Sequence, residues 1–390
     1  MKRKILQCVR ELRPGGGVSG VAYNLEQHFR LLDCETRRFT IEDLGRLSVK
    51  PHTTVQPLRK KLRTIFEGMW YSVAGTAIAR KRRLDSDVVV ITHNDVLFGD
   101  IYVNHGFHRG WLFDLPLPDR LLRLLFNPLH VFLLSREWLR FRLNVHRRIV
   151  CFCKTDADSL IRAYPTARDR IAFIPNGVDI ARFNPDQAAR ESLRQHLGYI
   201  DGDFVLIFVG HEFVRKGLRF ALDALPLLPS TVKLLVVGGA ADVSYGKFVR
   251  KVNDSDYSSR VQFLGTRADI PSLLNAADAL VLPSVSETWA LVGLEAMACG
   301  IPVLMTAVGG ITEYLHDGIN GFIVKRDAQD IAEKTRRLMD DAQRLEQLKT
   351  SARLTATQYS WSTVATAYLE LIDGIQREKR REAVSSDSQT

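Results

Sequence analysis

Two carboxylates stand eight positions apart in the segment 284–310, which reads SVSETWALVGLEAMACGIPVLMTAVGG. Glu287 follows an apolar run at 279–282, and Glu295 lies inside the apolar helix that the pattern predicts for residues 291–298. In open parallel sheets, ligands bind outside the carboxyl ends of the strands. The spacing therefore predicts that both carboxylates accept hydrogen bonds from the hydroxyl groups of a ligand. The alternative is a surface glutamate followed by a solvated helix glutamate.

A pair of cations is expected at the same edge of the sheet. Arg215 and Lys216 follow the strand predicted at 204–210, within the run GHEFVRKG. An arginine fork and a lysine point charge together suit a diphosphate, although a solvated basic turn has the same composition. The N–H groups that open the predicted 291–298 helix would face the same space, and they belong to Ala290, Leu291 and Val292.

Two features of the first half could also line a ligand site. Gly16 and Gly17 belong to a Pro-Gly-Gly-Gly run between the first predicted strand and the first predicted helix. Glycine lets a backbone approach a phosphate closely, but a flexible turn explains the same residues. His105 follows an apolar run and precedes a glycine, which leaves room for a ligand, whereas a lone histidine is more often structural. His93 and His108 are the second and third candidates.

Basic charge is concentrated in the first half of the chain. Residues 1–170 contain 30 Lys and Arg against 17 Asp and Glu, whereas the remaining residues contain 24 against 27. The basic clusters at 59–63 and 80–83 suit an anionic membrane surface, a nucleic acid or no partner at all. No nucleic-acid-binding module is recognisable, so we expect no nucleic-acid partner.

The sequence carries no recognisable signal for a membrane span, a secretory leader or a metal site. No apolar run approaches the roughly 18 residues that a transmembrane helix needs, and we expect a cytoplasmic protein. The five cysteines have no paired spacing and are expected to be reduced. We interpret the run Asp156-Ala157-Asp158 as a helix start, and we expect neither a metal nor another cofactor.

Strands alternate with helices along the chain, which predicts βαβ units and parallel sheets. The expected fold class is therefore α/β, with two Rossmann-like domains in the 390 residues. The run PNGVD at 175–179 indicates a boundary, so that residues 1–174 and 175–360 form one domain each. A helix at 361–378 follows, and the charged, serine-rich residues 379–390 are expected to be disordered.

Several of these motifs resemble those of retaining GT-B glycosyltransferases of family GT4, the glycosyl transferases group 1. The E-x7-E pair, the RKG run, the PNGVD linker and the GG-x-x-E run at 309–313 carry the resemblance. Within the family, the chain looks like the enzymes of lipopolysaccharide-core or phosphatidylinositol-mannosyl type. One departure is Ala290, where the family usually carries a glycine.

The resemblance implies two domains that face each other across a cleft, with the 361–378 helix crossing back to the N-terminal, acceptor-binding domain. It assigns Glu295 to the ribose of a UDP-, GDP- or dTDP-sugar. Glu287 and His105 would contact the donor sugar, and the two cations would stabilise the leaving diphosphate without a metal. The expected catalytic residues are His105, Arg215, Lys216 and Glu287. The expected donor-binding residues are Gly16, Gly17, Gly210, Arg215, Lys216, Arg267, Ala290, Leu291, Val292 and Glu295.

The predicted function is retaining transfer of a sugar to a hydroxyl of a cell-surface glycan precursor, with a saccharide or glycolipid as acceptor. Residues 111–143 combine apolar and aromatic residues with arginines, which suits docking on the inner face of the cytoplasmic membrane or an ordinary pair of core helices. A nucleotide-sugar 2-epimerase on the same fold is one alternative. A non-catalytic basic protein that binds membrane surfaces or nucleic acid is the other.

Overall fold

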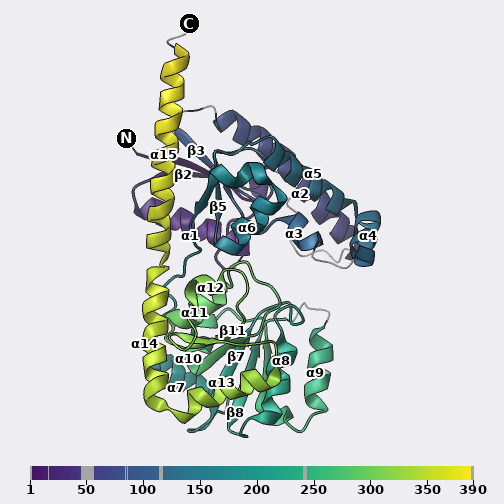
Figure 1. Ribbon diagram of the computed structural model, residues 1–390, viewed down its shortest axis with the longest axis vertical. Coiled ribbons are helices and arrows are strands. Elements are labelled where there is room, and N and C mark those ends of the chain that lie inside the picture. Colours follow the sequence, from purple (N-terminus) through teal and green to yellow (C-terminus); the bar gives the residue numbers. More distant parts are fainter. Residues whose placement is uncertain are drawn as a thin grey trace. The chain divides into compact units, whose positions relative to one another are not determined.

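The computed structural model describes residues 2–15, 17–44, 57–83, 85, 87–113, 117–239 and 244–387. The chain forms two compact units, the first from Met1–Asn176 with Trp361–Thr390 and the second from Gly177–Ser360 (Figure 1). Each unit contains a parallel β-sheet with helices packed against it. The expected α/β fold class is therefore confirmed. None of the described helices is long and apolar enough to cross a membrane.

In its described residues, the first unit has a sheet in the order β2-β1-β3-β4-β5-β6, with parallel pairings throughout. Its strands are β1 (Lys4–Cys8), β2 (Glu35–Phe39), β3 (Val88–His93), β4 (Ile101–Val103), β5 (Arg148–Cys151) and β6 (Ile171–Phe173). Its α-helices are α1 (Gly17–Leu31), α2 (Pro57–Arg83), α3 (His108–Phe113), α4 (Leu117–Phe126), α5 (Pro128–Arg142), α6 (Lys154–Ala163) and α15 (Trp361–Asp387). Short 3-10 helices occupy Ile41–Leu44 and Pro165–Arg170.

The second unit has a parallel sheet in the order β12-β11-β10-β7-β8-β9, counted over its described residues. Its strands are β7 (Phe204–Val209), β8 (Val232–Val237), β9 (Val261–Gly265), β10 (Ala279–Leu282), β11 (Val303–Met305) and β12 (Gly321–Ile323). Its α-helices are α7 (Gln187–His196), α8 (Leu218–Ala224), α9 (Tyr245–Asn253), α10 (Ile270–Ala276), α11 (Leu291–Ala298), α12 (Ile311–Tyr314), α13 (Ala328–Asp340) and α14 (Ala342–Gln358). Short 3-10 helices occupy Leu225–Leu227 and Ser258–Arg260.

The apolar runs of the sequence became buried strands, as expected for sheets covered by helices. The predicted strand 279–282 and the predicted helix 291–298 are confirmed as β10 and α11. The strand expected at 301–305 begins two residues later, at Val303. Pro302 has no N–H to donate to a ladder, although its carbonyl accepts a hydrogen bond from Leu280 N.

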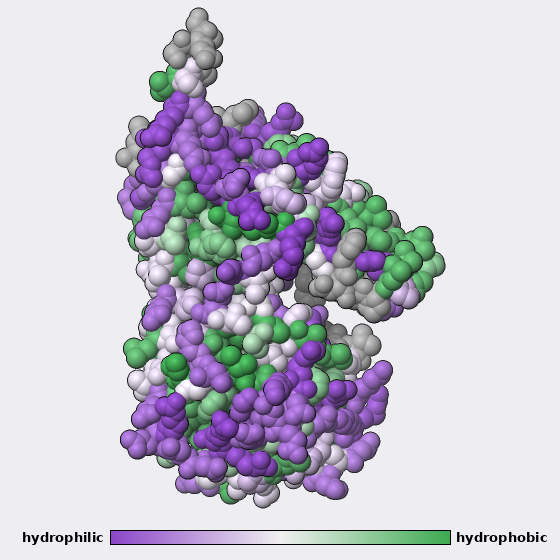
Figure 2. All heavy atoms as spheres, viewed as in Figure 1, coloured by the Kyte–Doolittle hydropathy of each residue, from purple (hydrophilic) through white to green (hydrophobic). Residues whose placement is uncertain are grey.

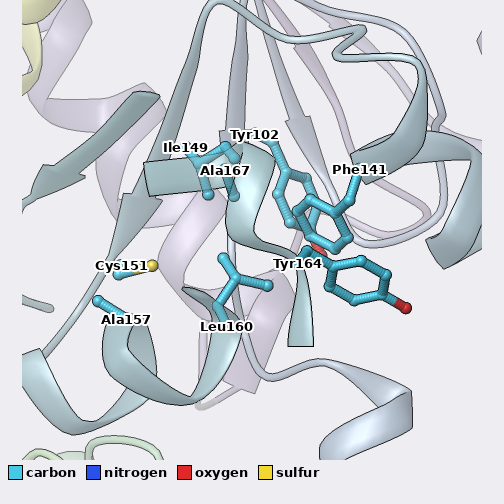
Figure 3. Packing of buried hydrophobic residues seen from close by; sticks show 8 residues of the cluster. All are labelled: Tyr102, Phe141, Ile149, Cys151, Ala157, Leu160, Tyr164 and Ala167. Carbon is cyan, nitrogen blue, oxygen red and sulfur yellow. The ribbon is translucent and has the colours of Figure 1, made fainter. Parts of the chain in front are cut away.

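One core cluster of the first unit holds β4 and β5 against α5 and α6. Its buried members are Tyr102, Phe141, Ile149, Cys151, Ala157, Leu160, Tyr164 and Ala167 (Figure 3). The ring centroids of Phe141 and Tyr164 stack 4.6 Å apart, and Tyr102 meets Phe141 edge-on. This packing fixes the carboxyl ends of β4 and β5, where the loops that carry His105 and Phe152 begin.

The expectation of a disordered tail at 379–390 is wrong for the residues that the structure describes. Helix α15 continues to Asp387, and residues 388–390 lie outside the described part. Lys379 is buried and donates hydrogen bonds to the carbonyls of Asp85 and Val88, at 2.8 and 2.7 Å. Arg147 pairs with Glu382 at 2.6 Å. The composition of residues 379–390 predicted disorder because composition carries no information about partners. The partners of Lys379 and Glu382 lie far away in the sequence.

Candidate functional site

The strand order of the second unit reverses between β7 and β10. β8 and β9 lie on one side of β7, whereas β10, β11 and β12 lie on the other. Open α/β sheets bind ligands at such a switch point, outside the carboxyl ends of the strands. The segment after β7 carries Arg215 and Lys216, and the segment after β10 carries Glu287. The topology therefore brings the predicted cations and the first predicted carboxylate to one place.

Lys216 and Glu287 form the central ion pair of this site. Lys216 Nζ donates to Glu287 Oε1 at 2.8 Å, and Ser284 Oγ donates to the same oxygen at 2.8 Å. The side chain of Glu287 is only 8% exposed, and that of Lys216 is 15% exposed. Because water is largely excluded, the attraction between the two charges is strong. The ammonium group is thus held in place by a carboxylate from the neighbouring loop.

Arg215 belongs to the same charge cluster. Its Nε and Nη2 donate to Glu212 Oε2 at 2.8 and 2.6 Å, and its Nη1 donates to the carbonyl of Ser286 at 2.5 Å. Nη1 also lies 3.5 Å from Glu287 Oε1. Two cations therefore share two carboxylates, and the cluster is close to neutral. An incoming diphosphate would compete with the carboxylates for both cations.

Two glycines allow the loops around this ion pair to approach closely. A Cβ atom at Gly210 would lie 2.2 Å from Cδ of Lys216, so glycine is what lets the lysine stem cross the end of β7. Gly309 has a φ of +54°, and a Cβ atom there would lie 1.7 Å from the carbonyl oxygen of Glu287. Gly210, which the resemblance assigned to the donor site, thus also leaves room for the stem of Lys216.

Helix α11 starts near this cluster and carries Glu295 in its second turn. Its N-cap residue, Ala290, makes no side-chain cap, so the N–H groups of Leu291 and Val292 do not donate to a capping side chain. Glu295 is partly buried, and its carboxylate makes no hydrogen bond with the residues that the structure describes. Desolvation raises the pKa of Glu295 to about 7, while the nearby charges of Arg182 and Lys216 act in the opposite direction.

Ala290 has a left-handed backbone conformation, with φ 55° and ψ 67°. This conformation costs an L-residue roughly 1–2 kcal/mol, whereas the greater freedom of unfolded glycine costs about 0.4–1 kcal/mol. We expect Ala290→Gly to raise the free energy of unfolding of the second unit by about 0.5–1 kcal/mol, measured by urea denaturation. The control Ala342→Gly, in the first turn of α14, should lower it instead. Equal effects of the two substitutions would contradict the argument.

The structure places the other predicted donor-binding residues as follows. Arg267 follows β9, is 41% exposed and pairs with Asp269 through two nitrogens, at 2.8 and 2.6 Å. Gly17 is the first residue of α1 in the first unit and has a φ of +70°. Gly16 lies outside the described residues. No contact in the structure tests whether these residues bind a donor, so their roles remain predictions.

His105 lies just beyond β4 in the first unit and is partly exposed. Its Nε2 lies 3.0 Å from Nδ1 of His93, and its ring meets Phe152 edge-on, with the centroids 5.2 Å apart. Burial lowers the pKa of His105 well below its usual range, and His93 contributes in the same direction. His105 is therefore neutral near pH 7. His108, the third candidate, instead stacks on His130.

Sequence reasoning did not single out Ser284, although its hydroxyl holds Glu287. A signal was available, because Ser284 is the second residue after β10 and stands three positions before Glu287. The Asp156-Ala157-Asp158 run is part of α6, and Asp156 accepts a hydrogen bond from Asn104 Nδ2 at 2.8 Å. Among the described residues, no group of three or more His, Cys, Asp or Glu side chains could hold a metal ion.

Comparisons with known proteins identify glycosyltransferase families on both units. Residues 15–182 match the family model of Glycosyltransferase Family 4. Residues 203–341 match that of Glycosyl transferases group 1. A D-inositol 3-phosphate glycosyltransferase of Xylanimonas cellulosilytica is 32% identical over 244 residues, which cover 60% of this chain and 58% of that protein. The chain thus spans little more than half the length of this curated relative.

Two solved structures share the fold over nearly the whole chain. WaaG, a glycosyltransferase involved in lipopolysaccharide biosynthesis, has a TM-score of 0.75 at 21% identity, covering 95% of this chain and 100% of that one. Anabaena Alr3699/HepE in complex with UDP-glucose has a TM-score of 0.68 at 22% identity, covering 95% and 99%. The fold is therefore that of the GT-B glycosyltransferases. The two family models, one on each unit, show that residues 203–341 belong to the glycosyl transferases group 1 and that residues 15–182 belong to Glycosyltransferase Family 4.

Proposed function

We propose that this protein is a glycosyltransferase that moves a sugar from a nucleoside diphosphate sugar to a hydroxyl group. The observation that carries the proposal is the cluster of Arg215, Lys216 and Glu287 at the switch point between β7 and β10. Paired cations suit a diphosphate, and the carboxylate of Glu295 suits the neighbouring hydroxyls of a ribose. Similarity to a D-inositol 3-phosphate glycosyltransferase and to a chain that binds UDP-glucose supports the proposal.

In the proposed reaction, the bond between the anomeric carbon and the β-phosphate oxygen breaks, and a bond from that carbon to the acceptor oxygen forms. Negative charge develops on the leaving diphosphate, where Arg215 and Lys216 would stabilise it without a metal ion. We propose retention by substitution on the same face of the sugar, with the acceptor proton passing to the leaving phosphate oxygen. Glu287 would orient Lys216 and contact the donor sugar, and neutral His105 would bind a sugar hydroxyl.

Thermal-shift measurements with UDP-, GDP- and dTDP-sugars, in the presence of EDTA, test this proposal. Saturation with the correct donor should raise the melting temperature by roughly 5–10 °C, because the ligand binds only the folded state. Glu295→Ala and Lys216→Ala should abolish the shift. The control Arg219→Ala, which removes an exposed cation of α8, should retain it. The proposal fails if no nucleotide sugar stabilises the wild type, or if both site variants are stabilised as strongly as the wild type.

The raised pKa of Glu295 predicts that donor binding depends on pH. The folded protein without ligand holds the proton of Glu295 up to a pH of about 7, whereas ribose hydroxyls are bound best by the ionised form. Affinity for UDP-glucose should therefore rise roughly tenfold between pH 6 and pH 8, measured by calorimetry. UDP-glucose is preferable to UDP, whose terminal phosphate titrates in the same range. Glu295→Gln should bind more weakly and with little dependence on pH, and an unchanged pH profile in this variant would refute the assignment.

The carboxyl group of Glu295 makes the stability of the unliganded protein depend on pH in the direction opposite to that of donor affinity. Its folded pKa lies above its unfolded value, so the folded state binds the proton more tightly than the unfolded state does. The stability that Glu295 contributes is complete below the unfolded pKa and is lost as the pH rises through about 7. Stability without ligand and affinity for the donor should therefore change in opposite directions across this range.

We further propose that the acceptor is presented at an anionic membrane surface. Helix α4 exposes an apolar stripe, and exposed apolar residues also recur on α2 at intervals of three or four. These residues are Leu117, Leu121, Leu122, Leu125 and Phe126 on α4, and Phe66, Met69, Trp70 and Val73 on α2. Figure 2 shows a hydrophobic area where Figure 1 places α4 and α5. The basic residues 80–82 end α2 on exposed positions, which supports an anionic surface over a neutral one.

Residues 111–143 combine features of both alternatives, core helices and a membrane-docking surface. Helix α5 buries Glu137, Arg140 and Phe141 but exposes Val131 and Trp138. Helix α4 exposes most of its apolar side chains. The side chains of the basic cluster 59–63 lie outside the described residues. A docking role for this region therefore concerns α4 together with the exposed faces of α2 and α5.

Sedimentation with lipid vesicles tests the membrane proposal. The protein should sediment with phosphatidylglycerol-containing vesicles and much less with phosphatidylcholine alone, and added salt should weaken binding. Replacing Leu125 and Phe126 by serine should lower the partition coefficient at least tenfold, because each side chain loses burial worth about 1.5–3 kcal/mol. The control Ile200→Ser, which changes an exposed apolar residue of the second unit, should have no effect. Binding unchanged by the double substitution would refute this docking surface.

A further inference from the structure

A chain of three side chains connects the core of the first unit to His105. The carboxamide of Gln7, which lies in β1 and is fully buried, donates from Nε2 to the carbonyl of Ala22 at 3.2 Å. This bond orients the amide, so that Oε1 is directed to His93, whose Nε2 lies 3.2 Å away. The other ring nitrogen of His93 lies 3.0 Å from Nε2 of His105. Each link joins groups that are distant in sequence.

Hydrogen-bond donors and acceptors along this chain can be assigned in one consistent way. An amide oxygen only accepts, so Nε2 of His93 must carry its proton and donate to Gln7. Burial lowers the pKa of His93 to about 3, so its ring is neutral and its Nδ1 can only accept. His105 must then carry its proton on Nε2 and donate to His93. The Nδ1 of His105 is left as an acceptor, without a partner among the described residues.

We propose that Gln7 and His93 are positioning residues that fix the tautomer of His105 and present its Nδ1 as a hydrogen-bond acceptor. The edge-on contact with Phe152 fixes the plane of the ring, so both the orientation and the protonation state are set. The role of this acceptor rests on the proposed function, because a sugar hydroxyl would donate to Nδ1 of His105. A His105 with the opposite tautomer would present an N–H group and require an acceptor from the ligand instead.

Nitrogen-15 NMR of the histidine side chains, recorded on the protein without nucleotide sugar, tests the inference. Imidazole N–H protons exchange rapidly with water unless they are held in a hydrogen bond. The wild type should show protected Nε2–H signals for both His93 and His105, and a scalar coupling between His105 Nε2 and His93 Nδ1 across their hydrogen bond. His105→Asn identifies the His105 signals by removing them.

Two substitutions of His93 distinguish positioning of His105 by a hydrogen bond from positioning by packing alone. His93→Leu fills the space without an acceptor and should abolish the protected His105 signal. His93→Asn places an amide oxygen near the site of Nδ1 and should restore it. Gln7→Met should abolish protection of the His93 Nε2–H. Circular dichroism establishes that each variant is folded.

The inference is overturned if His105 carries its proton on Nδ1 in the wild type, or if His93→Leu leaves the protected His105 signal unchanged. Neither result depends on a donor or an acceptor. If the protein binds no nucleotide sugar but shows the expected tautomers, the proposed function is contradicted and the positioning of His105 by Gln7 and His93 is not. If the protein binds a nucleotide sugar but shows the opposite tautomer of His105, only the positioning by Gln7 and His93 is contradicted.

Discussion

Lys216→Ala should lower kcat for nucleotide release from the donor sugar by roughly 10²–10³-fold, the cost typical of losing one preorganised group that stabilises developing charge. The physical reason is that Lys216 Nζ is already fixed 2.8 Å from Glu287 Oε1 in a site that excludes most water. Its charge therefore needs little reorganisation when the diphosphate departs. The measurement is steady-state release of nucleoside diphosphate, with the nucleotide sugar that stabilises the wild type.

Gly210→Ala provides a matched test of the same idea without removing the charge. The added methyl group would lie 2.2 Å from Cδ of Lys216, so the lysine stem must move away from the end of β7. We expect a loss of kcat that is smaller than that of Lys216→Ala but clearly measurable. Arg219→Ala should behave as the wild type does. Activity of Lys216→Ala within about twofold of the wild type would exclude Lys216 from leaving-group stabilisation.

Asp100→Ala should have the largest effect on stability, about 3–5 kcal/mol in the unfolding of the first unit. The carboxylate of Asp100 is fully buried and lies 3.4–3.6 Å from nitrogens of Lys379, Arg83 and Arg147. It also accepts a hydrogen bond from the N–H group of Val90 at 2.9 Å. Removing it leaves cations without a counter-charge and one buried donor without a partner.

Differential scanning calorimetry should resolve this loss as a fall of roughly 10 °C in the transition of the first unit. Asp100→Asn should lose less, because an amide oxygen can still accept from Val90. Glu35→Ala, which breaks an exposed pair with Arg37, should change stability by no more than about 0.5 kcal/mol. If Asp100→Ala were as mild as Glu35→Ala, the buried cluster would not be what holds α15 to the first unit.

The candidate site could be predicted in part because its chemistry is local in sequence. The eight-residue interval between Glu287 and Glu295 and the adjacency of Arg215 and Lys216 are visible without a structure. Hydrophobic periodicity placed β7, β10 and α11 around them to within a residue. Their meeting at one point follows from strand order, which periodicity does not specify, but the rule for ligand sites in open α/β sheets anticipates it.

Other features depend on residues that are far apart in sequence and meet only after folding. Composition indicated a disordered tail, yet Lys379 and Glu382 extend α15 because their partners lie at the ends of β3 and β5. The hydrogen bond between Gln7 and His93 joins positions 86 residues apart. No local pattern encodes such a pairing.

By itself, the sequence determined the α/β class, the carboxylate and cation motifs, and the expected GT-B resemblance, because these depend on periodicity and short-range spacing. Only the tertiary structure determined which carboxylate holds Lys216, which atoms a side chain at position 210 would meet, and which nitrogen of His105 lies next to His93. The physical reason is that hydrogen bonds and close contacts act over about 3 Å. Residues reach that distance through strand pairing and loop packing, which order along the chain does not specify.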